Sequence, residues 1–216
     1  MRVAIAGGHG KIALRLTRLL ADRGDSVVSL IRTPDHGEDI RAAGGEPVVC
    51  DLEAASDAEV ADAVRGAEAV VFAAGAGPGS GPERKETMDY GGAVKLIAAA
   101  KASGIRRYLM ISSMGADPNA EGDGFAVYLR AKGRADAELE ASGLDHTIVR
   151  PGRLTDDPGT GQVWLAEKVE RGEIPRDDVA AVLCECLAEP GTIGRTVGLV
   201  AGDTPVQEAV SALSRA

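Results

Sequence analysis

Short apolar runs alternate with segments of helical periodicity along most of the chain, and this alternation predicts an α/β fold. Residues 3–6 read as a first strand, and apolar side chains from Ile12 to Leu20 then recur at the spacing of a helix. Further strands are expected at residues 26–31, 46–50, 67–74, 107–112 and 146–149. Helices are expected between them, at residues 38–43, after the capping residue Ser56, and at residues 86–103 and 125–142.

These strands are apolar along nearly their whole length, which is typical of strands that are buried on both faces. Such strands form parallel sheets covered by helices, and right-handed crossovers between them give a doubly wound sheet. We therefore expect residues 1–216 to form a single α/β domain with a doubly wound parallel sheet. Ligands of such sheets bind at the carboxyl ends of the strands, which here follow residues 6, 31, 50, 73, 112 and 150.

The alternation loosens in the last third of the chain. Residues 153–175 read as irregular with one short strand at 163–165, and apolar positions between Val179 and Leu187 mark an amphipathic helix. A strand at residues 196–200 and a helix at 205–213 follow. We expect residues from about 151 to 216 to add a minimal substrate-side region to the domain.

The charge balance narrows the expected partners. The chain has 24 Lys and Arg against 33 Asp and Glu, a formal net charge of −9, which disfavours nucleic acid and anionic membranes as partners. It has no signal segment and no apolar run long enough to span a membrane, so a cytoplasmic location is expected. The expected partner is an unidentified small-molecule substrate, and the sequence leaves homo-oligomerisation open.

The cysteines and histidines predict no metal site. Cys184 and Cys186 are too close for a CxxC motif, and Cys50 stands alone. Together with the three histidines they match no familiar zinc-ligand spacing, so we expect buried free thiols in a reducing compartment.

Glycines follow the first strand at a spacing that is typical of phosphate binding. Gly7 and Gly10 stand three apart, and Ala13 occupies the place of a third small residue. In a strand–turn–helix context the first glycine permits a tight turn, the next lets the backbone approach a pyrophosphate, and the helix N-terminus offers N–H groups to the anion. The alternative is an ordinary strand-to-helix connection. We predict a dinucleotide site at this turn, made by Gly7, Gly10, Lys11 and Ile12.

Arg32 closes the second predicted strand and indicates which dinucleotide binds. An acidic residue at this place binds the ribose hydroxyls of NAD, whereas an arginine accommodates the 2′-phosphate of NADP. Lys11 could add positive charge at the same end of the sheet. The alternative is a surface arginine. We therefore favour NADP(H) over NAD(H) as the cofactor.

Two further strand ends carry candidate cofactor-binding residues. Asp51 could accept a hydrogen bond from an adenine amine and Leu52 could cover the ring, although Asp51 could equally cap the following turn. The fourth strand ends in small residues that would let the backbone lie against a ribose and the pyrophosphate, or that serve only strand–helix packing. These small residues are Ala73, Ala74 and Gly75.

Tyr128 and Lys132 are the strongest catalytic candidates. Their spacing of four places both side chains on one face of the predicted helix 125–142. A lysine ammonium favours the phenolate form of a neighbouring tyrosine, so the pair can exchange a proton near neutral pH. The same ammonium could hydrogen-bond the nicotinamide ribose. Ser112 and Ser113 end the fifth predicted strand, where a hydroxyl could hold the substrate oxygen.

Taken together, these features resemble the short-chain dehydrogenase/reductase superfamily in its atypical or extended branch. More narrowly, the chain is similar to small NAD(P)H-binding epimerase/dehydratase-like proteins, which are related to the NmrA-like and biliverdin-IX-beta/flavin reductase groups. The motifs that carry the resemblance are Gly7-x-x-Gly10-x-x-Ala13, Ala73-Ala74-Gly75, Ser112-Ser113, Tyr128-x-x-x-Lys132 and Arg150-Pro151-Gly152.

The resemblance implies an NAD(P)-binding Rossmann fold and assigns roles to several residues. Tyr128 would be the acid/base, Lys132 its partner, and Ser113 or Ser112 the hydroxyl that orients the substrate. Pro151 and Gly152 would lie near the nicotinamide.

Three functions are consistent with this sequence. The leading hypothesis is an NADP(H)-dependent oxidoreductase that acts on a small carbonyl/alcohol pair. The first alternative is a non-catalytic NADP(H)-binding redox sensor or regulatory protein. A flavin- or biliverdin-type reductase ranks lower, because one Trp, two Phe and three Tyr supply few stacking platforms. A nucleotide-sugar epimerase is not expected, because only residues 152–216 follow Pro151.

Overall fold

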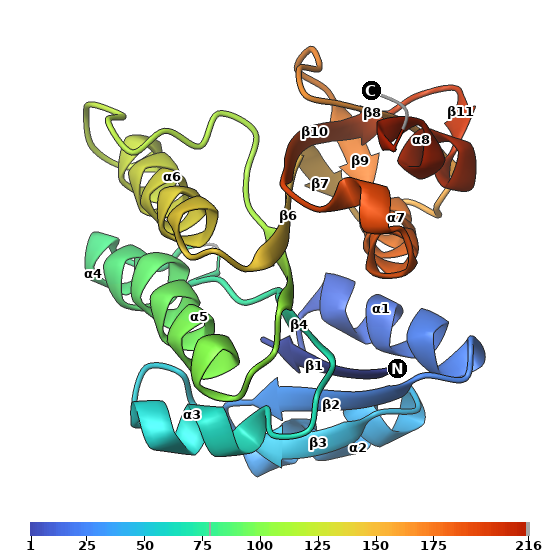
Figure 1. Ribbon diagram of the computed structural model, residues 1–216. Coiled ribbons are helices and arrows are strands. Elements are labelled where there is room, and N and C mark those ends of the chain that lie inside the picture. Colours follow the sequence, from blue (N-terminus) through green and yellow to red (C-terminus); the bar gives the residue numbers. More distant parts are fainter. Residues whose placement is uncertain (78, 215–216) are drawn as a thin grey trace.

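The computed structural model describes residues 1–77 and 79–214, and Figure 1 shows how its elements are arranged. These residues contain a nine-stranded sheet in the order β11-β8-β10-β6-β5-β4-β1-β2-β3. Its strands are β1 (Arg2–Ala6), β2 (Ser26–Ile31), β3 (Glu46–Val49), β4 (Ala69–Phe72), β5 (Arg107–Ile111), β6 (Asp145–Pro151), β8 (Gln162–Ala166), β10 (Arg195–Ala201) and β11 (Thr204–Pro205).

Seven of these strands, from β3 across to β10, pair in parallel, which confirms the predicted doubly wound parallel sheet. At one edge of the sheet β8 pairs antiparallel with both β10 and β11. Strands β10 and β11 follow one another in the chain with two residues between them, and they lie on either side of β8.

Helices cover both faces of the sheet. One apolar core lies between the sheet and α1, α7 and α8, and a second lies between the sheet and α3, α5 and α6 (Figure 1). Strand β1 shows why both cores form, since Val3 and Ile5 enter the first core and Ala4 and Ala6 the second. The α-helices are α1 (Lys11–Asp22), α2 (Gly37–Ala42), α3 (Asp57–Ala63), α4 (Pro82–Arg84), α5 (Ala93–Ala102), α6 (Phe125–Ala141), α7 (Arg176–Ala188) and α8 (Val206–Leu213). Single 3-10 turns are η1 (Pro34–His36) and η3 (Pro190–Thr192).

The predicted helix 86–103 is two elements in the structure. It begins with a π-helical segment, η2 (Lys85–Gly92), and continues as α5. π-helical turns place an extra residue in a helix and are frequent at functional sites. Here the segment packs against α6 and brings the buried Asp89 toward the carboxyl end of β4.

Residues 153–175, predicted to be irregular around one short strand, contain three strands. The expected strand at 163–165 is confirmed as the centre of β8. The other two, β7 (Arg153–Thr155) and β9 (Glu173–Pro175), form a small parallel sheet of their own beside β10. Three residues are too few to show the alternation that identifies a strand in sequence.

The three cysteines are buried free thiols, as predicted. Burial raises the pKa of all three, and it raises that of Cys186 to about 12. Thiols of this kind stay protonated and inert at neutral pH. No group of three or more His, Cys, Asp or Glu side chains in the described residues is arranged to hold a metal ion. None of the helices described is both long enough and apolar enough to cross a bilayer.

Candidate active site

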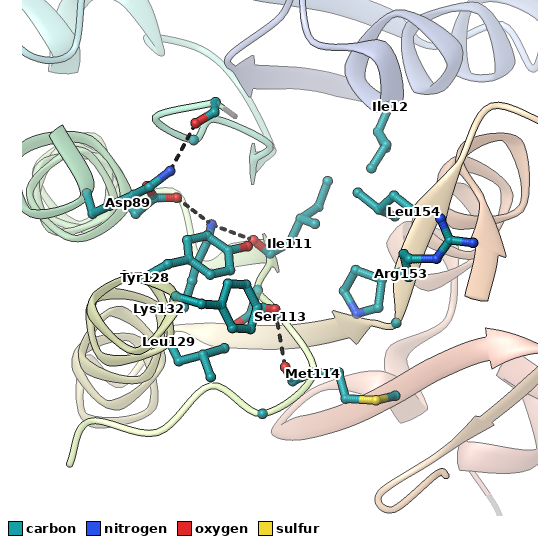
Figure 2. A pocket seen from close by; sticks show the side chains of 18 of the residues that line it. Ile12, Asp89, Ile111, Ser113, Met114, Tyr128, Leu129, Lys132, Arg153 and Leu154 are labelled. Atoms are coloured by element: carbon teal, nitrogen blue, oxygen red, sulfur yellow. Dashed lines mark hydrogen bonds and ion pairs between the residues drawn. The ribbon is translucent and has the colours of Figure 1, made fainter. Parts of the chain in front are cut away.

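A cavity of about 1250 Å³ opens at the carboxyl ends of β1, β4, β5 and β6. The chain leaves β1 toward β2 and β3 on one side and returns to β4 on the other, so the cavity lies where the winding direction reverses. Figure 2 shows Tyr128 and Lys132 on one side of this space, facing Ile12, Arg153 and Leu154 across it. The predicted site residues that line it are Ile12, Ala73, Ala74, Gly75, Ser112, Ser113, Tyr128, Lys132, Pro151 and Gly152.

The glycine turn packs closely against the loop after β4. Gly7 has φ +75°, and a Cβ there would lie 2.6 Å from the Cα of Ala74, so both the conformation and the space require glycine. Gly10 is the N-cap residue of α1, and its N–H donates to the carbonyl of Gly7 at 2.8 Å. No described side chain caps this helix, and its first turn holds no acidic residue. The first N–H groups of α1 are therefore left for an anion.

Sequence reasoning missed the tight packing of Gly8, which directly follows the first glycine of the pattern. A Cβ at Gly8 would lie 2.5 Å from the Cβ of Ser29 on β2. The turn is thus fixed from both sides, by β2 and by the loop after β4.

Lys11 contributes less positive charge to the glycine turn after β1 than the sequence suggests. Its Nζ pairs with Asp156 at 2.5 Å, and Arg176 holds the other oxygen of that carboxylate at 2.8 Å. These cations hold the pKa of Asp156 below its usual value, mainly through the hydrogen bond from Lys11. Lys11 therefore ties α1 to the segment after β7.

Arg32 lies exposed at the end of β2 and makes no hydrogen bond or ion pair with residues 1–77 or 79–214. Beside it, the rings of His9 and His36 stack with centroids 3.8 Å apart, and Nε2 of His9 lies 2.7 Å from a carboxylate oxygen of Asp39. The stack joins the glycine turn to η1, the segment that follows Arg32. An accessible guanidinium at this strand end suits a phosphate.

The structure places Asp51 and Leu52 at the end of β3, outside the cavity. A carboxylate oxygen of Asp51 accepts from the N–H of Glu53 at 3.0 Å, as in a turn-capping role. The side chain of Leu52 is buried in the second core. Their contact with an adenine ring stays a prediction.

Lys132 is buried and held by two partners beneath Tyr128. It is 3% exposed, and its Nζ donates to the carbonyl of Ile111 at 3.1 Å and lies 3.4 Å from Oδ1 of Asp89. The same Nζ is 6.0 Å from the centroid of the half-buried Tyr128 ring. Helical spacing of four thus brings both side chains to the cavity, as predicted.

Asp89 is a site residue that sequence reasoning missed. It is 1% exposed and lines the cavity, its Oδ2 accepts from the N–H of Ala76 at 3.2 Å, and its Oδ1 has no hydrogen bond within the described residues. The ion pair with Lys132 is therefore the principal compensation for this buried charge. In the sequence it is one acid in a predicted helix, and only the fold reveals its partner.

The structure distinguishes the two serines at the end of β5. Ser112 is buried and donates to Oδ2 of Asp136 at 2.7 Å, where Arg150 also donates at 2.9 Å. Burial raises the pKa of Asp136, while the bonds from Ser112 and Arg150 act in the opposite direction. Ser113 is half-buried in the cavity wall, and within the described residues its hydroxyl makes one hydrogen bond, to the carbonyl of Met114 at 3.3 Å (Figure 2). Ser113 is therefore the more exposed of the two serines that line the cavity.

Pro151 and Gly152 form the floor between β6 and β7. A Cβ at Gly152 would lie 2.3 Å from the carbonyl oxygen of Gly172, so the loop before β9 packs directly on this backbone. That loop adds Arg171 to the cavity, and the first residue of β9 adds Glu173. Neither residue is part of a motif, and sequence reasoning missed both.

Comparisons with known proteins identify the family of this chain. The family model described as NAD(P)H-binding matches residues 7–190. The chain is 41% identical to a Bacillus subtilis protein named uncharacterized sugar epimerase YhfK, over 99% of this chain and 100% of that protein. It is 35% identical to a UPF0659 protein of Saccharomyces cerevisiae, over 99% of each chain.

Solved structures show the same fold. A putative NAD-dependent epimerase/dehydratase from Bacillus halodurans has a TM-score of 0.92 at 38% identity and covers 98% of this chain and 99% of its own. ChuY, an anaerobilin reductase from Escherichia coli, has a TM-score of 0.80 at 25% identity and covers 94% of this chain and 98% of its own.

Proposed function

Because the chain belongs to the NAD(P)H-binding family of atypical short-chain dehydrogenases/reductases, we propose that it is an NADP(H)-dependent oxidoreductase acting on a carbonyl/alcohol pair. The observation that carries the proposal is the placement of Tyr128 above the buried Lys132, facing a cavity at the strand ends. Measuring NADPH oxidation with a panel of aldehydes and ketones tests it. Turnover supports an enzyme, whereas NADPH binding without turnover of any compound supports a coenzyme sensor.

The residues present fit a dinucleotide. The uncapped N-terminus of α1 offers N–H groups to a pyrophosphate, and the backbone beside it carries no side chain at Gly7 or Gly10. Small residues 73–75 line the adjoining wall and leave room for a ribose. Lys132 has three N–H donors and one hydrogen bond within the described residues, to the carbonyl of Ile111, so N–H groups are left for a ribose hydroxyl.

The side chains of this protein would supply the proton and the positive charge that stabilises the group from which the proton leaves. The bound coenzyme would supply the hydride. In the direction of reduction, the Tyr128 hydroxyl donates its proton to the substrate oxygen, and the nearby Lys132 ammonium stabilises the tyrosinate that is left. Ser113 donates a hydrogen bond to the same oxygen and so fixes its position.

The two serines are expected to respond differently to alanine substitution. Ser113→Ala should lower kcat/KM by about tenfold, because it removes one hydrogen bond to the reacting oxygen. Ser112→Ala should lower the free energy of unfolding by about 1–3 kcal/mol, because the buried Asp136 loses a partner. Steady-state kinetics and urea titrations on both variants check this. The assignment fails if Ser112→Ala has the larger kinetic effect in folded protein.

Arg32→Asp is expected to reverse the coenzyme preference. The wild type should bind NADPH more tightly than NADH, and the variant should bind NADPH about 10- to 100-fold more weakly, because a charge-assisted contact to the 2′-phosphate is worth about 1.5–3 kcal/mol. Calorimetric Kd values for both coenzymes measure this. Arg18→Asp, the same charge change at an exposed position of α1, is the control. Equal Kd values in the wild type would contradict the NADP(H) assignment.

Reduction of a linear tetrapyrrole is a second candidate function. The similarity to the anaerobilin reductase ChuY and the cavity volume of about 1250 Å³ favour it. Biliverdin added to the same panel tests it, because its reduction changes its visible absorption. Turnover of biliverdin with none of the simple carbonyl compounds would replace the leading proposal by this one.

A further inference from the structure

The outer part of the cavity, beyond Tyr128, has an apolar wall. Met114, Phe125 and Leu129 line it, from the loop after β5 and the first turns of α6. Phe125 is 67% exposed, and its ring centroid lies 5.5 Å from that of Tyr128 with the planes tilted by 32°. An apolar ligand that covers this exposed phenyl ring binds more tightly, because apolar surface of both is removed from water.

The cavity as a whole carries an excess of positive charge. Two carboxylates line it, and each is already paired with a cation: Asp89 with Lys132 and Glu173 with Arg153. Arg171 lines the cavity too, is exposed, and makes no hydrogen bond or ion pair with any described residue.

Lys85 adds to this excess on the side of Tyr128. Its Nζ lies 5.4 Å from the centroid of the Tyr128 ring and donates to the carbonyl of Gly77 at 3.0 Å, and no carboxylate of the described chain pairs with it. A chain with a net charge of −9 thus places two cations without acidic partners at the cavity that holds its acid/base. Such a local reversal of sign attracts an anion.

We propose that the substrate combines an apolar, aromatic-sized body with a carboxylate. The body lies against Phe125 and Leu129, and Arg171 binds the carboxylate across the cavity through its planar fork of N–H groups. Figure 2 shows the two sides that would be bridged, with Leu129 and Tyr128 opposite Arg153. The inference rests on the proposed function, since it names the substrate class of the same site.

Binding of two unreactive ligands tests the inference separately from turnover. With NADP saturating, 2-naphthoate should bind the wild type at least about tenfold more tightly than its neutral isostere 2-naphthamide in calorimetry. Arg171→Gln should reduce the affinity for 2-naphthoate to that for 2-naphthamide, and Arg18→Gln, at an exposed position outside the cavity, should change neither. Phe125→Ala should weaken both ligands by the same factor. Equal affinities of the two ligands for the wild type would overturn the proposal.

The aldehydes of the activity panel separate this proposal from the one on which it rests. Reduction of 4-carboxybenzaldehyde with a higher kcat/KM than 4-methylbenzaldehyde, lost in Arg171→Gln, supports both. Equal turnover of the two aldehydes overturns the substrate class and leaves the oxidoreductase. Selective binding of 2-naphthoate without turnover of any aldehyde overturns the oxidoreductase and leaves the anion site.

Discussion

Tyr128→Phe is expected to lower kcat for carbonyl reduction by about 10²- to 10⁴-fold, because it removes the proton donor of the reaction. Coenzyme affinity should stay within about twofold, since the α1 N-terminus, residues 73–75 and Lys132 are unchanged. The effect should therefore appear in kcat with little change in the Kd of NADPH. Single-turnover kinetics and calorimetry on the same preparation measure the two quantities.

Tyr90→Phe is the matched control for this substitution. Tyr90 lies in η2 and donates to Glu138 at 3.2 Å, its ring is stacked on Arg134, and it is not part of the cavity wall. Removing its hydroxyl should leave kcat unchanged. The role given to Tyr128 is wrong if its variant keeps the wild-type rate, or if Tyr90→Phe loses as much.

Asp89→Ala is expected to lower the free energy of unfolding by about 3–5 kcal/mol, because it leaves the charge of Lys132 buried without its partner. Asp62→Ala is the control, since Asp62 forms an exposed ion pair with Arg65, and such pairs contribute about 0–1 kcal/mol. Urea titrations of both variants measure the difference. Domains of this kind are stable by only about 5–15 kcal/mol, so the midpoint for Asp89→Ala should fall markedly.

A double substitution separates the charge effect from simple loss of packing. Asp89→Leu combined with Lys132→Met replaces the buried pair by apolar side chains, which is often neutral for stability. The double variant should recover most of the loss of Asp89→Ala and should be inactive, because Tyr128 has lost its cation. If the double variant is as unstable as Asp89→Ala, the loss of stability in Asp89→Ala does not come from the unpaired charge of Lys132.

Local signals were sufficient for much of the fold. Buried parallel strands show continuous apolar runs, and for this reason β1 and β2 lie where the sequence predicts them. Ser56 caps α3 as expected, accepting from the N–H of Glu59 and completing a capping box. By contrast, β7 and β9 depend on pairing with each other, and three residues carry too little pattern to predict it.

The candidate site likewise has features that the sequence predicts and features that only the fold reveals. The spacing of Tyr128 and Lys132 is local to one helix and therefore legible in the sequence. Asp89 lies 43 residues before Lys132 and meets it only because η2 packs on α6. The same holds for Ser112, whose neighbour Ser113 looks equivalent until the fold buries one hydroxyl against Asp136. Contacts between residues that are distant in the sequence decide which groups are structural and which are free to react. The sequence alone does not reveal these contacts.

Transfer of deuterium from NADPH labelled at C4 of the nicotinamide tests the central claim most directly. The two C4 diastereomers of the labelled coenzyme would each be incubated with a carbonyl compound that is reduced in the panel, beginning with 4-carboxybenzaldehyde, and the alcohol analysed by mass spectrometry. We predict one deuterium at the former carbonyl carbon with one diastereomer and none with the other, and no labelled alcohol with Tyr128→Phe on the same timescale. Binding of NADPH without labelled alcohol from either diastereomer, for any compound of the panel, would contradict the account.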